Sequence, residues 1–140
     1  MGISVNITTE SWSVDSKEWL ATRKGFDTCR SVTLDLSLFT SGDGCGADDY
    51  IPSGTVIGLV TASGLYGPYN PTATDGTETA AGHIFEAARI TDSDKNAFTR
   101  AVVPMLWEGV VIASKLLVFS GAKGEIDTAG KADLTHVRYE

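Results

Sequence analysis

The sequence predicts a mainly β domain with minor helix, preceded by an extended N-terminal arm. Apolar and polar residues alternate in several short segments, which is the period of a half-buried strand. Fifteen glycines and four prolines separate these segments with turn signals. Helix signals are confined to two short stretches. A hydrophobic content of 42% in 140 residues is enough for one packed core, and it excludes a disordered or collagen-like chain.

The first residues carry a strand pattern without a neighbouring partner. Ile3, Val5 and Ile7 alternate with polar residues, and a polar stretch follows them. The run 15–18 (DSKE) then has the form of a capping box, which predicts a short helix over 16–24.

Trp12 and Trp19 are expected to be exposed in this region. We therefore expect an arm over residues 1–28 and a β-rich domain over 29–140. The alternative, an ordinary first strand and helix of the core, stays open.

From Ser31 onward the strand pattern is stronger. Ser63-Gly64 predicts a tight turn, because glycine adopts positive φ without strain. Pro104 favours an edge or a break in its strand. Asp127 is placed to cap a short helix that ends at Leu134. The predicted strands cover 32–38, 50–61, 80–86, 101–113 and 136–139, with irregular structure at 41–49 and 64–79.

The net charge of −7 is unevenly distributed along the chain. No Lys or Arg occurs between Arg30 and Arg89, whereas this span holds seven acids. Such a surface repels phosphate, so we expect no nucleic-acid partner. The apolar runs are shorter than the roughly 20 residues of a membrane span, so we also expect no membrane partner. The first residues lack the basic start and apolar core of a signal peptide, which predicts synthesis inside the cell.

Candidate catalytic residues are few. Cys29 and Cys45 are expected to be reduced thiols, because no CxxC motif or secretory signal accompanies them. His83 lies in an apolar run, which favours a buried structural role over that of a catalytic base. A Cys45–His83 dyad is the sharpest enzyme hypothesis, but residue type alone supports it. We expect no catalytic site.

Two acidic stretches have the composition of a cation site without its pattern. Asp92 and Asp94 resemble the start of a calcium loop, but Ala97 and Val103 stand where glycine and a bidentate glutamate are needed. The loop 41–49 contains three aspartates, which are read as a solvated turn. We expect no metal and no cofactor.

Two stretches together resemble a known family. YIPSGTVIGLVT (50–61) followed by GLYGPYNPTATDGTETAAGHIFE (64–86) is similar to the head decoration proteins of tailed bacteriophages, the lambda-type family. MLWEGVVIASKL (105–116) and DTAGKADLTHVRYE (127–140) share the shape of related phage proteins. The resemblance covers roughly residues 28–140.

The resemblance implies a small β-barrel or β-tulip-like domain with a structural, non-enzymatic role. Such proteins bind the major capsid protein on the outer surface of the expanded head as homotrimers, and they stabilise the virion against the pressure of packaged DNA. Synthesis would take place in the host cytoplasm. The N-terminal region is longer here than in the lambda type, so its contacts are inferred from the residues themselves. The expected capsid-contact residues are Ile3, Val5, Ile7, Trp12, Trp19 and Leu20.

Two other classes of function stay open at this point. A β-rich module for a small ligand or glycan would use Trp107, Tyr66 and Tyr69 as a stacking platform. A cysteine-dependent enzyme would use the Cys45–His83 dyad.

Overall fold

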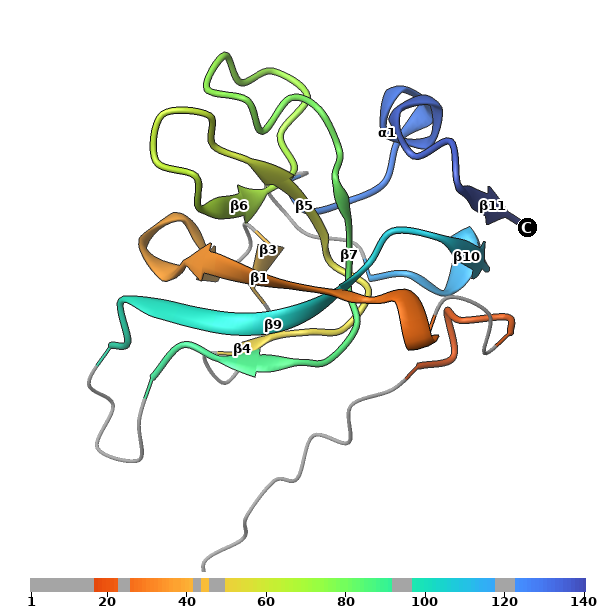
Figure 1. Cartoon of the computed structure of the whole chain (residues 1–140), viewed down its shortest axis with the longest axis horizontal. Helices are drawn as coiled ribbons and strands as arrows, with labels where there is room; N and C mark the ends of the chain where they lie inside the picture. The colour runs from red at the N-terminus through yellow and green to blue at the C-terminus, as the bar shows by residue number, and fades with distance from the viewer. Residues whose placement is uncertain (1–16, 23–25, 42–43, 46–49, 92–96, 118–122) are drawn as a thin grey trace, which may run out of the picture.

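A closed five-stranded barrel forms the centre of the fold, with strand order β1-β6-β5-β7-β9 (Figure 1). The computed structural model describes residues 17–22, 26–41, 44–45, 50–91, 97–117 and 123–140. Neighbouring barrel strands are antiparallel, except that β1 and β6 pair in parallel. The strands are β1 (Arg30–Asp35), β5 (Val56–Leu59), β6 (Tyr66–Pro68), β7 (Gly82–Ile84) and β9 (Arg100–Leu106).

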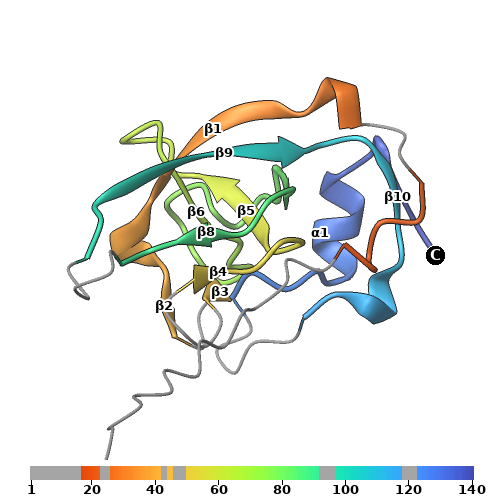
Figure 2. The same ribbon diagram turned by 90° about the horizontal axis from the view of Figure 1, so that it is seen from below.

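Short sheets and helices surround this barrel. The two-stranded sheets pair β2 (Thr40–Ser41) with β3 (Gly44–Cys45), β4 (Tyr50–Ile51) with β8 (Ala88–Arg89), and β10 (Gly109–Val111) with β11 (Val137–Tyr139). The described helical segments are η1 (Phe26–Thr28), η2 (Leu36–Leu38), η4 (Ala113–Lys115) and α1 (Thr128–Asp133). Both views place α1 and β10 together at one side of the barrel (Figures 1 and 2). The predicted β-rich barrel with minor helix is confirmed.

Strand β1 begins where the alternation predicts and ends earlier. Val32 and Leu34 are buried in the barrel, as the pattern requires. The Asp35 carboxylate accepts hydrogen bonds from the backbone N–H of Ser37 at 3.1 Å and from its hydroxyl at 2.6 Å. This local cap starts η2, so the predicted strand over 36–38 is wrong.

The predicted strand over 50–61 is divided in two. Pro52 and Thr55 form a turn between β4 and β5, in which the Thr55 hydroxyl donates to the Pro52 carbonyl at 2.7 Å. Gly54 has φ +88 in this turn. β4 then pairs with β8 outside the barrel, while β5 enters it.

The segment predicted as irregular over 64–79 contains a barrel strand. Gly64 adopts φ +72, which confirms the turn at Ser63-Gly64. Directly after it, β6 pairs with β5 through Leu59 opposite Tyr66. Glycine and proline within 66–68 hide this strand in the sequence, because their low strand propensity is overridden by pairing on both sides.

The predicted strand over 101–113 also divides, but not at its proline. Pro104 lies inside β9, and the chain breaks at 107–108 before β10. The Pro104 carbonyl accepts from the N–H of Phe85, just beyond the end of β7. The N–H that proline lacks would point beyond the end of β7. Its absence therefore costs the barrel little strand pairing.

Both C-terminal predictions are confirmed. The Asp127 carboxylate accepts from the N–H of Gly130 at 2.7 Å and caps α1, which is followed by Leu134 at the C-cap. Strand β11 then closes the chain by pairing in parallel with β10.

Apolar side chains form two cores. One fills the barrel, and the other lies between the barrel and the unit formed by α1, β10 and β11, which we call the C-terminal unit. The fully buried residues of the first include Leu34, Ile51, Ile57 and Ile84. Those of the second include Val56, Tyr69, Leu106 and Val111.

Two glycines with positive φ allow a matched test of steric packing. Gly76 has φ +113, and a Cβ there would collide with the Leu59 carbonyl and approach Thr61, whereas a Cβ on Gly64 would meet open space. We expect Gly64→Ala to lower the free energy of unfolding by about 1 kcal/mol through backbone strain. Gly76→Ala should cost about 3 kcal/mol, because the collision adds to that strain. Equal losses in urea denaturation would show that the close packing around Gly76 is absent.

Candidate functional site

The expected capsid-contact residues divide into two groups. Ile3, Val5, Ile7 and Trp12 lie outside the residues that the structure describes. Trp19 and Leu20 are described, and both belong to the second core. The site that the structure displays is therefore the point at which the N-terminal segment joins the body.

Trp19 is buried, with 2% of its surface exposed, so the expectation that it is exposed is wrong. Its indole N–H donates to the Ser53 hydroxyl at 3.2 Å. Its ring stacks on the imidazole of His83 at 5.7 Å between centroids. Gly54 lies so close that a Cβ there would stand 3.1 Å from the indole nitrogen. This slot buries the large aromatic surface of Trp19, which offsets the cost of ordering the chain around it.

The backbone around Trp19 joins the sheet of the C-terminal unit. The N–H of Ile112 donates to the Trp19 carbonyl at 2.7 Å, and the N–H of Ala21 donates to the Val110 carbonyl at 3.0 Å. Leu20 thereby forms an antiparallel bridge with Val111. The described part of the helix predicted over 16–24 is a turn and this bridge, because pairing with β10 overrides the local helix signal.

The N-terminal segment and β11 lie on opposite edges of β10. Gly109 and Val111 bond to the two residues that flank β11, through the His136 carbonyl and the Glu140 N–H. Val110 and Ile112 bond to the N-terminal segment. Residues near both ends of the chain are thus held by one three-residue strand.

His83 connects these parts and has no exposed surface. Its Nδ1 lies 2.9 Å from the Gly54 carbonyl and its Nε2 lies 2.7 Å from the Tyr139 hydroxyl. A carbonyl can only accept, so Nδ1 carries the proton and Nε2 accepts from Tyr139. Burial lowers the pKa of His83 to about 4, and the hydrogen bond to Gly54 opposes that shift. Burial also raises the pKa of Tyr139 well above its usual value.

The Cys45–His83 dyad is not formed. Both ring nitrogens of His83 have other partners, and the Cys45 thiol donates to the Tyr50 carbonyl at 3.2 Å. Cys29 and Cys45 are not joined in a disulfide in the structure. Burial, and secondarily the charge of Glu86, raise the pKa of Cys29, so its thiol is a poor nucleophile near neutral pH.

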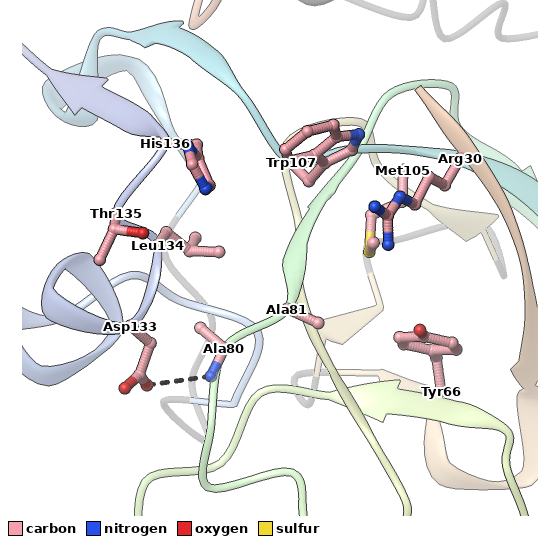
Figure 3. Close-up of a pocket in the computed structure, with 10 residues that line it drawn as sticks. All are labelled: Arg30, Tyr66, Ala80, Ala81, Met105, Trp107, Asp133, Leu134, Thr135 and His136. Carbon is pink, nitrogen blue, oxygen red and sulfur yellow. Dashed lines mark hydrogen bonds between the residues drawn. The ribbon is translucent and has the colours of Figure 1, made fainter. Parts of the chain in front are cut away.

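The structure separates one of the three aromatic residues of the stacking platform, Tyr69, from the other two. Tyr69 is fully buried, and its hydroxyl donates to the Asp127 carboxylate that caps α1. Trp107 and Tyr66 line one cleft between the barrel and the C-terminal unit (Figure 3). Arg30 stacks on Trp107 from one wall of that cleft.

The described residues contain no group of three or more His, Cys, Asp or Glu side chains that could hold a metal ion. Asp92 and Asp94 lie outside the described residues, as does most of the loop 41–49. None of the described helices is long and apolar enough to cross a membrane.

The Trp19 slot predicts a large stability effect from a residue near the N-terminus. Trp19→Ala should lower the free energy of unfolding by about 3–5 kcal/mol, because it empties a buried site. Trp19→Phe should lower the free energy of unfolding by less than Trp19→Ala. It loses the hydrogen bond to Ser53, but it keeps an aromatic ring beside His83. Chemical denaturation measures both. A loss below about 1 kcal/mol for Trp19→Ala would contradict burial of the indole.

His83 predicts a pH dependence of stability. Its folded pKa of about 4 is below the unfolded value near 6.5, so the unfolded chain binds more protons between these values. Stability is full above about pH 6.5 and falls by roughly 3 kcal/mol as the pH drops to about 4. Urea denaturation at several pH values should show this loss in the wild type and in His136→Gln, whose histidine is exposed. His83→Gln should remove this part of the slope; an unchanged slope would overturn the assignment.

The comparisons with known proteins agree with this architecture. No curated protein matches the chain. Residues 42–137 match the family described as bacteriophage lambda head decoration protein D. The matched range is more than half of the chain, and it holds four of the five barrel strands and nearly all of the C-terminal unit. The chain therefore belongs to the lambda-type head decoration proteins, a family of structural components of the bacteriophage capsid.

Proposed function

We propose that the chain decorates the outer surface of the expanded phage head as homotrimers and stabilises the shell against the pressure of packaged DNA. The observation that carries this proposal is the family match over residues 42–137. The other two classes of function receive less support from the structure. Tyr69 is buried away from the stacking platform, and the Cys45–His83 dyad does not form.

We further propose that residues 1–16 bind the major capsid protein. The arm first expected over 1–28 is shortened here, because Trp19 and Leu20 are integrated into the second core. Burial of Trp19 supports this division, since it ties the chain to the body at a defined point just after residues 1–16.

The composition of this arm suits strand addition. Ile3, Val5 and Ile7 would lie on one face of an extended strand, while backbone hydrogen bonds to the edge of a capsid sheet would supply affinity. Trp12 offers a large aromatic contact of the kind that dominates interfaces. Three arms on one trimer raise the overall affinity without any new type of contact.

Removal of residues 1–16 tests the proposal. The truncated protein should keep its fold and oligomeric state and lose about a hundredfold or more in affinity for expanded shells, which corresponds to roughly 3 kcal/mol per arm. Co-sedimentation with purified shells measures binding, and circular dichroism checks the fold. Full binding by the truncated protein would place the capsid contacts in the body.

Substitutions within the arm supply matched controls. Serine at positions 3, 5 and 7 together should weaken binding, because it removes the apolar face of the proposed strand. Alanine at positions 4, 6 and 8 changes the same number of residues on the opposite face, and it should have a smaller effect. Equal effects would contradict strand addition by this face.

A further inference from the structure

The cleft beside Trp107 holds a preorganised cation. The guanidinium of Arg30 lies over the indole ring, with Cζ 4.8 Å from its centroid (Figure 3). The indole N–H donates to the Thr28 carbonyl at 2.6 Å, which fixes the ring. Within the part of the chain that the structure describes, no carboxylate forms an ion pair with Arg30. A stacked guanidinium keeps its N–H edge available for bidentate binding of a carboxylate.

The other walls of the cleft leave room for the methylene groups of a side chain that carries such a carboxylate. His136 contacts the edge of the Trp107 ring, with centroids 5.5 Å apart at 84°. Ala80, Ala81 and Met105 contribute apolar surface to the cleft, beside the polar side chains of Tyr66, Thr135 and His136 (Figure 3). Its volume is about 220 Å³, which is enough for one side chain.

The acidic group already present in this cleft is occupied elsewhere. The Asp133 carboxylate stands on the wall formed by the C-terminal unit, and it accepts from the N–H of Ala80 at 3.0 Å (Figure 3). Glu108, which follows Trp107, accepts from the Thr28 hydroxyl at 2.9 Å. Both carboxylates bond to other groups of the chain, and neither forms an ion pair with Arg30 in the part of the chain that the structure describes.

The charge distribution of the chain favours an acidic side chain of a second copy as the occupant of the cleft. The span between Arg30 and Arg89 contains seven acids and no Lys or Arg. In a cyclic trimer each subunit presents one face to a different face of its neighbour. A carboxylate of this span against the Arg30 guanidinium satisfies that requirement, whereas two acidic surfaces would repel each other.

We propose that the cleft between Arg30, Trp107 and His136 is a socket for an acidic side chain from a second copy of this chain. The inserted carboxylate pairs with the Arg30 guanidinium, and its methylene stem packs against Ala81 and Met105. The socket rests on the homotrimer of the proposed function, and it identifies one contact that holds that trimer together.

Charge reversal tests the socket. Sedimentation analysis should show that Arg30→Glu needs about tenfold or more higher protein concentration to assemble, because a carboxylate then faces a carboxylate. Arg89→Glu makes the same change in charge at an exposed arginine outside the cleft, and it should assemble like the wild type. Equal assembly by both variants would overturn the socket. Circular dichroism verifies that each variant is folded.

Zero-length cross-linking identifies the partner without depending on a destabilised variant. Arg30→Lys keeps the positive charge and introduces an amine that a carbodiimide joins to a neighbouring carboxylate. In a mixture of ¹⁴N- and ¹⁵N-labelled copies, mass spectrometry should detect amide links from position 30 to an Asp or Glu of the other isotope.

The outcomes separate the two proposals. Links confined to one isotope, or no links in a trimer, would overturn the socket and leave the trimer intact. A wild-type protein that stays monomeric at every concentration would overturn the homotrimer itself and the socket with it. Links that form only with added shells and only to the capsid protein would assign the cleft to that protein, which overturns the second copy as occupant.

Discussion

A buried histidine that must keep both ring nitrogens hydrogen-bonded connects the separate parts of this fold. An unpaired nitrogen in such a place would cost about 1–3 kcal/mol, so the position of His83 requires an acceptor on one side and a donor on the other. Gly54, in the turn before β5, supplies the acceptor, and Tyr139, in the last strand, supplies the donor. Trp19 covers the imidazole from the N-terminal segment. The two ends of the described chain are therefore coupled to the barrel through one side chain.

Because Trp19 is held in the core, the N-terminal segment leaves the body of the protein at a fixed point. A peptide that binds a capsid subunit pays for the order it acquires, and a fixed attachment point lowers that cost. Trp19 provides the attachment because its ring lies in the core and its carbonyl belongs to the sheet of the C-terminal unit. The family match begins at residue 42, so this attachment lies outside the matched range. The proposed arm and Trp19, which anchors it, therefore lie before the part of the chain that matches the family.

The charge pattern fits assembly into a shell. A protein packed at high density on a surface gains solubility from net negative charge, but neighbouring copies then repel each other. A few well-placed cations reduce this repulsion where copies meet. In the proposed socket Arg30 is such a cation, because it stacks on Trp107 at the wall of the cleft (Figure 3). The acidic span can then contribute outward-facing charge elsewhere.

The sequence alone predicts the β-rich class, the turn at Gly64, the helix capped by Asp127, the closing strand and the family resemblance. Each depends on residues close together in the chain: alternation along a strand, positive φ at a glycine, or a cap three residues from its N–H. Tertiary structure decided that residues 66–68 form a barrel strand and that Trp19 is buried, because both depend on partners far away in the sequence. It likewise brought Arg30 to Trp107 and separated Tyr69 from them. Local patterns report which face of an element is apolar, whereas the partner that covers that face is chosen by the packing of the whole chain.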